Sequence, residues 1–325
     1  MDLIYMNNNK EDLGVMKDYV IDLAFGLDEN DFECSVPISR HCCNAGYYLY
    51  FEGTEYGGII DSIRVDESNS EVVYMGRTWH GILNSKVLEP DANQDYLTVT
   101  GDANTVLNIL ISRMNLSSLF KASSNPSGIN VNYKMNRYIE GYTGICKMLK
   151  AHNAKLSIAF NNGYIQLSAV PLVDYSQGEQ FDTDQFDFSI QKYSNHINHV
   201  VCLGKGELAD REVIHVYADS NGNISTTQIL TELEEITAIY DNSNAESSEE
   251  LRQGGIDIIN ASWNSDLVDF SFNANDRVFD IGDIIGAKEW ITGIEVTAEI
   301  NKKIVTINNA VTTISYEVGD KTWHI

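Results

Sequence analysis

The chain has 325 residues, of which 43% are hydrophobic and 21% charged, so it can form two or three globular domains and is not disordered. Its net charge of −25 argues against a protein that binds nucleic acid through contacts to the phosphates. No secretory signal begins the sequence and no window approaches 18 apolar residues, so we expect neither export by that route nor membrane insertion. The five cysteines are irregularly spaced, and we expect reduced thiols in a cytoplasm.

Strands are predicted over residues 1–100. The clearest feature is a hairpin over residues 55–81, in which Ile59, Ile63 and Val65 are expected to share one face. Its second strand, residues 72–75, is apolar on both faces. Such a strand is typical of a position between a core and another domain or subunit.

Residues 101–182 have the pattern of a small α/β domain. Asp102 is a suitable N-cap for a helix whose core face is expected to carry Val106, Ile109, Leu110 and Met114. A second helix is expected near residues 140–153, with Ile145, Met148 and Leu149 facing the core. Asn162-Gly163 then predicts a type I′ turn between two strands.

Strands return over residues 183–325, with a helical insertion predicted around 228–258. Ser247 and Glu250 form a capping box for that short helix. A closing hairpin is expected to begin near Trp290 and to turn at residues 301–303. Residues 55–59 and 289–294 both begin a hairpin with an acid, an aromatic residue and a glycine. We therefore predict an α+β, mainly β fold, in which β modules at 1–100 and 183–325 flank the α/β domain.

Catalytic and metal-binding patterns are weak. His196 and His199 are three residues apart on a predicted strand, so their side chains should point to opposite faces and share no metal ion. His41-Cys42-Cys43 lacks a second ligand pair at a suitable spacing. The loop after Asp219 lacks the glycine and the final glutamate of a calcium loop, and a hairpin turn is favoured. We assign no catalytic, cofactor-binding or metal-binding residue.

Two alternative functions are consistent with the composition. Any two of the 47 acidic residues could serve as the carboxylate pair of a carbohydrate-active hydrolase. A glycan-binding module could instead use aromatic rings for stacking, which would require them to be exposed on a flat face. The rings concerned are Tyr47, Tyr48, Tyr50, Phe51, Tyr56 and Trp79.

Several stretches, in this order and spacing, resemble the tail hub or baseplate hub family of tailed bacteriophages, which includes the late control protein D type and siphovirus hubs. The acidic turn and strand at 28–33 resembles the family's N-terminal region, and residues 57–77 resemble its first-barrel hairpin. Residues 203–207 resemble its glycine-rich strand end. The stretch 279–285 resembles the Gly-Asp turn that opens its last barrel segment.

The resemblance implies a structural protein without enzymatic activity or cofactor, built from two small β-barrels and an inserted α/β domain. It implies a homotrimeric ring in the virion tail, assembled in the bacterial host cytoplasm. The ring would join the tail tube or distal tail protein to a spike or tip protein, and DNA and the tape-measure protein would pass through it without specific nucleic-acid binding.

Candidate partner-interface residues are Tyr74, Trp79 and Trp290. No host-binding or wall-degrading module is visible before the last residues, 323–325, so we expect a separate protein to supply the spike or enzyme.

Overall fold

A computed structural model describes residues 1–177, 187–191, 195–263, 267–273, 278–288, 295–308 and 311–324. The chain divides into two compact units. The first comprises Met1–Phe188 and Phe270–Ile325, and the second comprises Ser189–Asp269. None of the described helices is long and apolar enough to cross a membrane.

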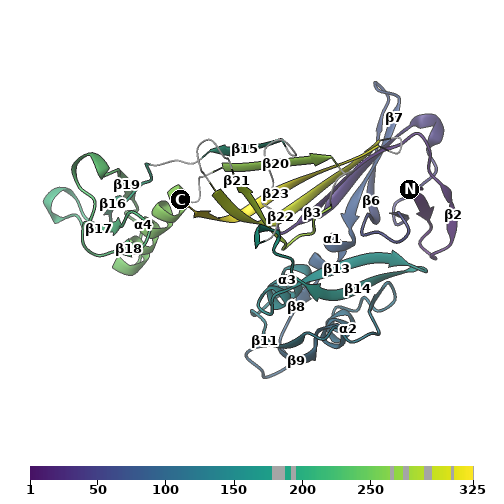
Figure 1. Cartoon of the computed structure of the whole chain (residues 1–325), viewed down its shortest axis with the longest axis horizontal. Coiled ribbons are helices and arrows are strands. Elements are labelled where there is room, and N and C mark those ends of the chain that lie inside the picture. The colour runs from purple at the N-terminus through teal and green to yellow at the C-terminus, as the bar shows by residue number, and fades with distance from the viewer. Residues whose placement is uncertain are drawn as a thin grey trace. The chain divides into compact units, whose positions relative to one another are not determined.

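Strands from both ends of the chain share the largest sheet (Figure 1). Over the described residues its order is β15-β20-β23-β22-β3-β4-β7-β6-β5-β1-β2, and β21 also pairs with β22. The N-terminal strands are β1 (Ile4–Met6), β2 (Asp12–Val15), β3 (Val20–Gly26), β4 (Asp31–Pro37), β5 (Tyr48–Tyr50), β6 (Gly57–Asp66) and β7 (Glu71–Thr78). The later ones are β15 (Asp187–Gln191), β20 (Leu267–Asn273), β21 (Ile284–Lys288), β22 (Glu295–Asn308) and β23 (Val311–His324).

This architecture confirms the predicted α+β, mainly β fold. The antiparallel pair β22–β3 joins the C-terminal strands to the N-terminal ones. Within this sheet the described pairs run in one path from β15 to β2, with β21 as a branch on β22, and no described pair joins the two ends of the path. Closure into two barrel modules, and the domain boundaries, stay predictions.

The β6–β7 hairpin is present, but its predicted apolar face is wrong. The register passes from Ile60–Gly76 to Ser62–Met75, so Asp61 is an extra residue in β6. Ile59 consequently lies opposite Arg77, whereas Ile63 lies opposite Tyr74, on the other face of β7. The β-bulge breaks the period of two on which the prediction depended.

Glycine at position 76 permits this bulge. A Cβ atom at Gly76 would lie 1.9 Å from the carbonyl oxygen of Ile59, closer than any non-bonded contact allows. The bulged Asp61 carboxylate accepts hydrogen bonds from Arg77 Nε at 2.8 Å and Nη2 at 2.7 Å. These Arg77–Asp61 hydrogen bonds stabilise the bulge.

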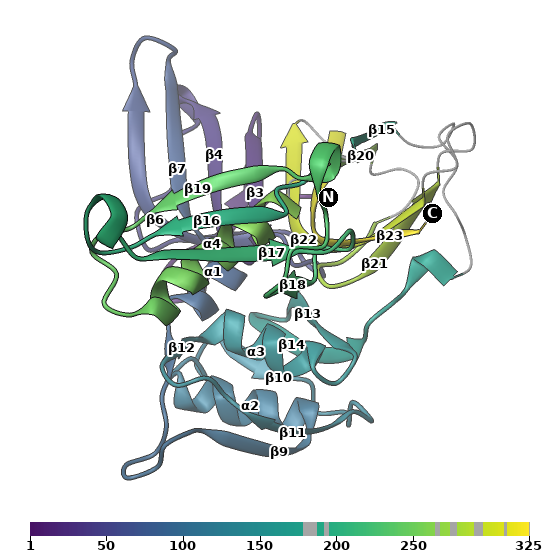
Figure 2. The same ribbon diagram turned by 90° about the vertical axis from the view of Figure 1, so that its left-hand side faces the viewer.

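The α/β segment packs directly on the first strands. Its elements are α1 (Trp79–Asn84), β8 (Val87–Leu88), β9 (Thr98–Asp102), α2 (Ala103–Arg113), β10 (Phe120–Ala122), β11 (Asn130–Lys134), β12 (Ile139–Glu140), α3 (Gly141–Lys150), β13 (Ala154–Asn161) and β14 (Tyr164–Pro171). Helices α2 and α3 pack against the sheet β10-β14-β13 (Figure 2). One core cluster contains residues of both parts, including Tyr50, Trp79 and Phe160.

The helix predictions are confirmed with one exception. Asp102 caps α2 by accepting the Asn104 backbone N–H at 3.0 Å. Val106, Leu110 and Met114 are buried, but Ile109 is 45% exposed. The buried stripe of α2 is centred on Leu107, Leu110 and Ile111, which turns Ile109 away from the core. Asn162 and Gly163 both have positive φ, as a type I′ turn requires.

The turn predicted at residues 301–303 is wrong. Strand β22 continues through these residues to Asn308, with register shifts against β23 on either side of Ile300. Lys302 and Lys303 pair with Gly26 and Phe25 of β3. Three consecutive polar residues usually indicate a solvent-exposed turn, but Lys303 is buried and its charge is neutralised by Glu55.

The second unit is a four-stranded sheet with one helix on one face. The order is β18 (Ile224–Ser225), β17 (Val213–Ala218), β16 (His199–Leu203), β19 (Thr237–Asp241), and the helix is α4 (Ser248–Trp263). As predicted, Ser247 Oγ accepts the Glu250 backbone N–H at 3.2 Å. The segment after Asp219 forms the expected turn between β17 and β18. Val200, Cys202 and Val216 pack with Leu251 and Ile259 in the core.

Candidate functional site: a buried charged junction

A buried lysine on β22 is paired with an acid from the loop between β5 and β6. Lys303 Nζ lies 2.6 Å from Glu55 Oε1, and only 1% of the lysine side chain is exposed. His80, on α1, places Nε2 3.5 Å from the other Glu55 oxygen. Residues from the two ends of the first unit's sequence therefore meet inside the fold.

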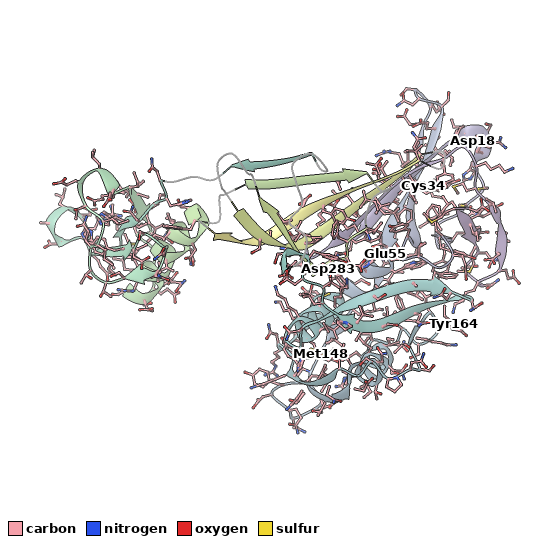
Figure 3. All side chains as sticks on the ribbon, viewed as in Figure 1. Asp18, Cys34, Glu55, Met148, Tyr164 and Asp283 are labelled. Atoms are coloured by element: carbon pink, nitrogen blue, oxygen red, sulfur yellow. The ribbon has the colours of Figure 1, made fainter. Side chains whose placement is uncertain are left out.

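A second lysine group lies beside the first. Lys155, on β13, has 7% of its side chain exposed and places Nζ 2.8 Å from Asp280 and 2.7 Å from Asp283. Asp283 is 1% exposed and also accepts backbone N–H bonds from Val173 at 3.0 Å and Asp280 at 3.1 Å. Lys303 lies 3.8 Å from Asp280, which joins the two groups. Figure 3 labels Glu55 and Asp283, which lie where the sheet meets the α/β segment.

A tight turn brings the two aspartates together. Asp283 N–H bonds to the Asp280 carbonyl at 3.1 Å, and Gly282 has a φ of +93° that favours glycine. This is the Gly-Asp stretch on which part of the family resemblance depends. The junction thus draws on the N-terminal strands, the α/β segment and the C-terminal strands.

A cavity of about 150 Å³ adjoins the junction. Its wall combines apolar side chains with the ionisable residues Glu55, His80, Lys147, Lys150, Lys155, Asp280 and Glu299. Cys146 also lines it, and burial raises the pKa of this thiol to about 12. The thiol is therefore protonated near neutral pH and is a poor nucleophile.

The electrostatics favour permanent ion pairs over proton transfer. Burial alone would raise the pKa of Glu55, but Lys303 and His80 outweigh it and bring the pKa to about 2. Burial would lower the pKa of Lys303 and of Lys155, but their carboxylate partners raise both. Glu55 is consequently ionised at neutral pH and cannot be the general acid that a glycosidase pair needs.

The aromatic cluster does not form a flat exposed face. Tyr50, Phe51, Tyr56 and Trp79 are buried, and Tyr47 and Tyr48 are half-buried. The ring centroids of Tyr50 and Phe160 are 3.9 Å apart, and Trp79 stacks on Phe160 at 5.8 Å. These rings pack the first strands on the α/β segment, which counts against sugar stacking by this cluster.

The candidate interface residues have different positions. Tyr74 and Trp79 are each 0% exposed within a single chain. The Tyr74 hydroxyl accepts the backbone N–H groups of Cys42 at 3.0 Å and Cys43 at 3.3 Å. Trp290 lies outside the described residues. An interface role for the three stays a prediction.

The histidines and cysteines singled out in the sequence also have defined partners. His196 Nδ1 bonds to the Ser262 carbonyl at 2.9 Å, whereas His199 bonds to Glu235 and to His215, so the two do not converge. The sulfur atoms of Cys42 and Cys43 are 3.7 Å apart. All five cysteines are free thiols.

Sequence reasoning missed the junction. Glu55 and Lys303 are 248 positions apart, and Lys155 and Asp283 are 128 apart, so no local spacing links them. The available signal was a lysine within a β-branched strand, at Lys303-Ile304-Val305-Thr306.

No family model matches this chain, and no curated protein matches its sequence. Among solved structures, it is similar to the 43 kDa tail protein of prophage MuSo2 from Shewanella oneidensis, with a TM-score of 0.52 and 10% identity over 98% of both chains. It is also similar to a tail protein from Neisseria meningitidis MC58 (0.49, 11%, 98% of this chain and 96% of that one). The prophage tail protein gp18 from Listeria monocytogenes EGD-e gives 0.49 and 13% over 98% and 95%. At such identity the likeness to the MuSo2 protein concerns the fold alone.

Proposed function

We propose that the chain is a structural component of a phage tail and forms its hub. The observation that carries this proposal is the shared fold with the MuSo2 tail protein over 98% of each chain. The sequence resemblance to hub proteins in residues 28–33, 57–77, 203–207 and 279–285 supports the same role independently.

The proposed hub is a homotrimeric ring between the tail tube, or distal tail protein, and a separate spike or tip protein. The junction suits such a part, because it ties three sequence-distant segments of each subunit into one body. A ring of identical subunits needs a different but matched surface on each side of the subunit. We also propose that the hub has no catalytic activity of its own.

The acidic surplus fits a passage for DNA and the tape-measure protein. A chain of net charge −25 repels phosphates and so does not retain DNA that moves through the ring. Filter binding with the purified chain at physiological salt should detect no DNA retention. Saturable binding would contradict this part of the proposal.

Deletion of the gene from its phage or prophage tests the assignment. Electron microscopy of induced particles should find incomplete tails or none, and a plasmid copy should restore them. Tails of normal length and infectivity without the gene would contradict a hub role. A catalytic or accessory tail protein would instead leave morphology intact and reduce only infection.

A further inference from the structure

Two histidines meet on the sheet face of the second unit that α4 leaves uncovered. The register places His199 of β16 opposite Tyr217 of β17, and Val201 opposite His215, so both imidazoles belong to one face. The other face, with Val200, packs under α4. His199 Nε2 and His215 Nδ1 are 2.8 Å apart.

A carboxylate fixes the orientation of the inner imidazole. Glu235 Oε1 lies 2.6 Å from His199 Nδ1, and Thr237 Oγ1 donates to the same oxygen at 3.2 Å. A carboxylate oxygen accepts hydrogen bonds and does not donate them. Nδ1 of His199 therefore carries the proton, and its Nε2 lone pair is directed at His215.

We propose that His199 Nε2 and His215 Nδ1 bind one divalent transition-metal ion, with Glu235 as the positioning carboxylate behind His199. A carboxylate that accepts the second N–H of a ligating histidine is the usual support of such sites. Two nitrogens about 2.0–2.1 Å from a tetrahedral ion are roughly 3.4 Å apart, so the pair must open by only about 0.6 Å.

The outer ligand can make this adjustment. His199 is 8% exposed and is held by Glu235 on one side and His215 on the other, whereas His215 is exposed and contacts only the rings of His199 and Tyr217 among the aromatic side chains. His215 must present its Nδ1 lone pair, so its proton moves to Nε2 and the ring stays neutral. No third His, Cys, Asp or Glu converges on the pair within the described part of the chain, so water completes the coordination.

Nitrogen ligands of this kind favour Cu²⁺ over Zn²⁺, and both over Mg²⁺ or Ca²⁺. The site is independent of the tail assignment, because it depends only on β16, β17 and the residue Glu235. It differs from the His196–His199 pair that the sequence excluded, since the second ligand comes from the neighbouring strand.

Calorimetric titration of the untagged full chain with Zn²⁺ and with Cu²⁺ tests the proposal. We expect one ion per chain, tighter binding of Cu²⁺, and loss of saturable binding in His215→Ala. Glu235→Gln should weaken binding by about 10–100-fold. The matched control is His41→Ala, an exposed histidine of the first unit beside Cys42 and Cys43, and it should bind like the native chain.

Absence of saturable binding, or unchanged binding in His215→Ala, would overturn the proposal. Loss of binding in His41→Ala would place the ion elsewhere and would also overturn it. If His215→Ala does not fold, electron paramagnetic resonance of the Cu²⁺-loaded native chain decides. Hyperfine structure from two imidazole nitrogens is expected, and a single nitrogen would refute the site.

Discussion

The ion pair between Lys303 and Glu55 is where we expect a single substitution to lower the free energy of unfolding most. Lys303→Met removes the lysine from the buried Glu55 carboxylate and leaves it only His80, at 3.5 Å; breaking a buried pair in this way typically costs about 3–5 kcal/mol of unfolding free energy. Lys150→Met is the matched control, because Lys150 pairs with Glu299 at 2.5 Å but is 58% exposed. It should cost less than about 1 kcal/mol.

Urea denaturation followed by circular dichroism measures both changes. Equal losses in the two variants would contradict a buried junction. In the double variant Lys303→Met/Glu55→Leu, part of the loss should be recovered, because removing both charges also removes the desolvation cost.

The low pKa of Glu55 predicts a specific acid dependence. Its pKa is about 2 in the folded chain against an ordinary value of 4.5, so its stabilising effect is complete above pH 4.5. That effect is lost as the pH falls from about 4.5 to 2, and amounts to about 3 kcal/mol at most. Stability measured across this window should decline less steeply in Glu55→Gln than in the native chain. Parallel curves would show that Glu55 is not the group responsible.

At the scale of single elements, the β6–β7 hairpin requires glycine at position 76. Gly76→Ala places a methyl group against the Ile59 carbonyl, so the bulge at Asp61 must be displaced. We expect a loss of about 1–3 kcal/mol or more. Gly128→Ala is the control, because its Cβ meets open space and only the positive φ of +74° opposes it. Thermal unfolding should show the larger decrease in Gly76→Ala; a decrease no larger than that of the control would contradict the bulge.

The elements also show how far sequence alone could reach. Local signals succeeded where the cause is local: the Asp102 cap, the Ser247 capping box and the Asn162-Gly163 turn are each set within a few residues. The face of β6 failed because one inserted residue, Asp61, reverses the alternation. The turn at 301–303 failed because β22 continues there by pairing with β3, and the carboxylate that neutralises Lys303 is 248 positions away.

The same limit applies to the candidate sites. The aromatic cluster near Tyr50 was visible in the sequence, but its role in packing the first strands on Phe160 needed the fold. In the sequence, His199 was compared with His196, which lies three residues before it. The actual histidine contact of His199 is His215, on the neighbouring strand. A sequence pattern describes the residues along one segment of the chain. The junction and the histidine pair instead depend on contacts between different segments, which no such pattern links.

At the scale of the whole molecule, the hub proposal predicts self-association. Light scattering across a concentration series should find a mass of about 109 kDa, three times that of the 36.4 kDa chain. A dimer at all concentrations would contradict a threefold ring. Because the chain carries a net charge of −25, self-repulsion should weaken the trimer at low salt, so the series should be repeated at raised ionic strength.

The position of the chain in the particle tests the central claim most directly. Gold-labelled antibody against this chain should be applied to purified, intact tailed particles and examined by negative-stain electron microscopy. We predict label confined to the end of the tail distal to the head. Label distributed along the tail tube or at the head, or absent from particles that contain every other tail protein, would contradict the proposal that this chain is the tail hub.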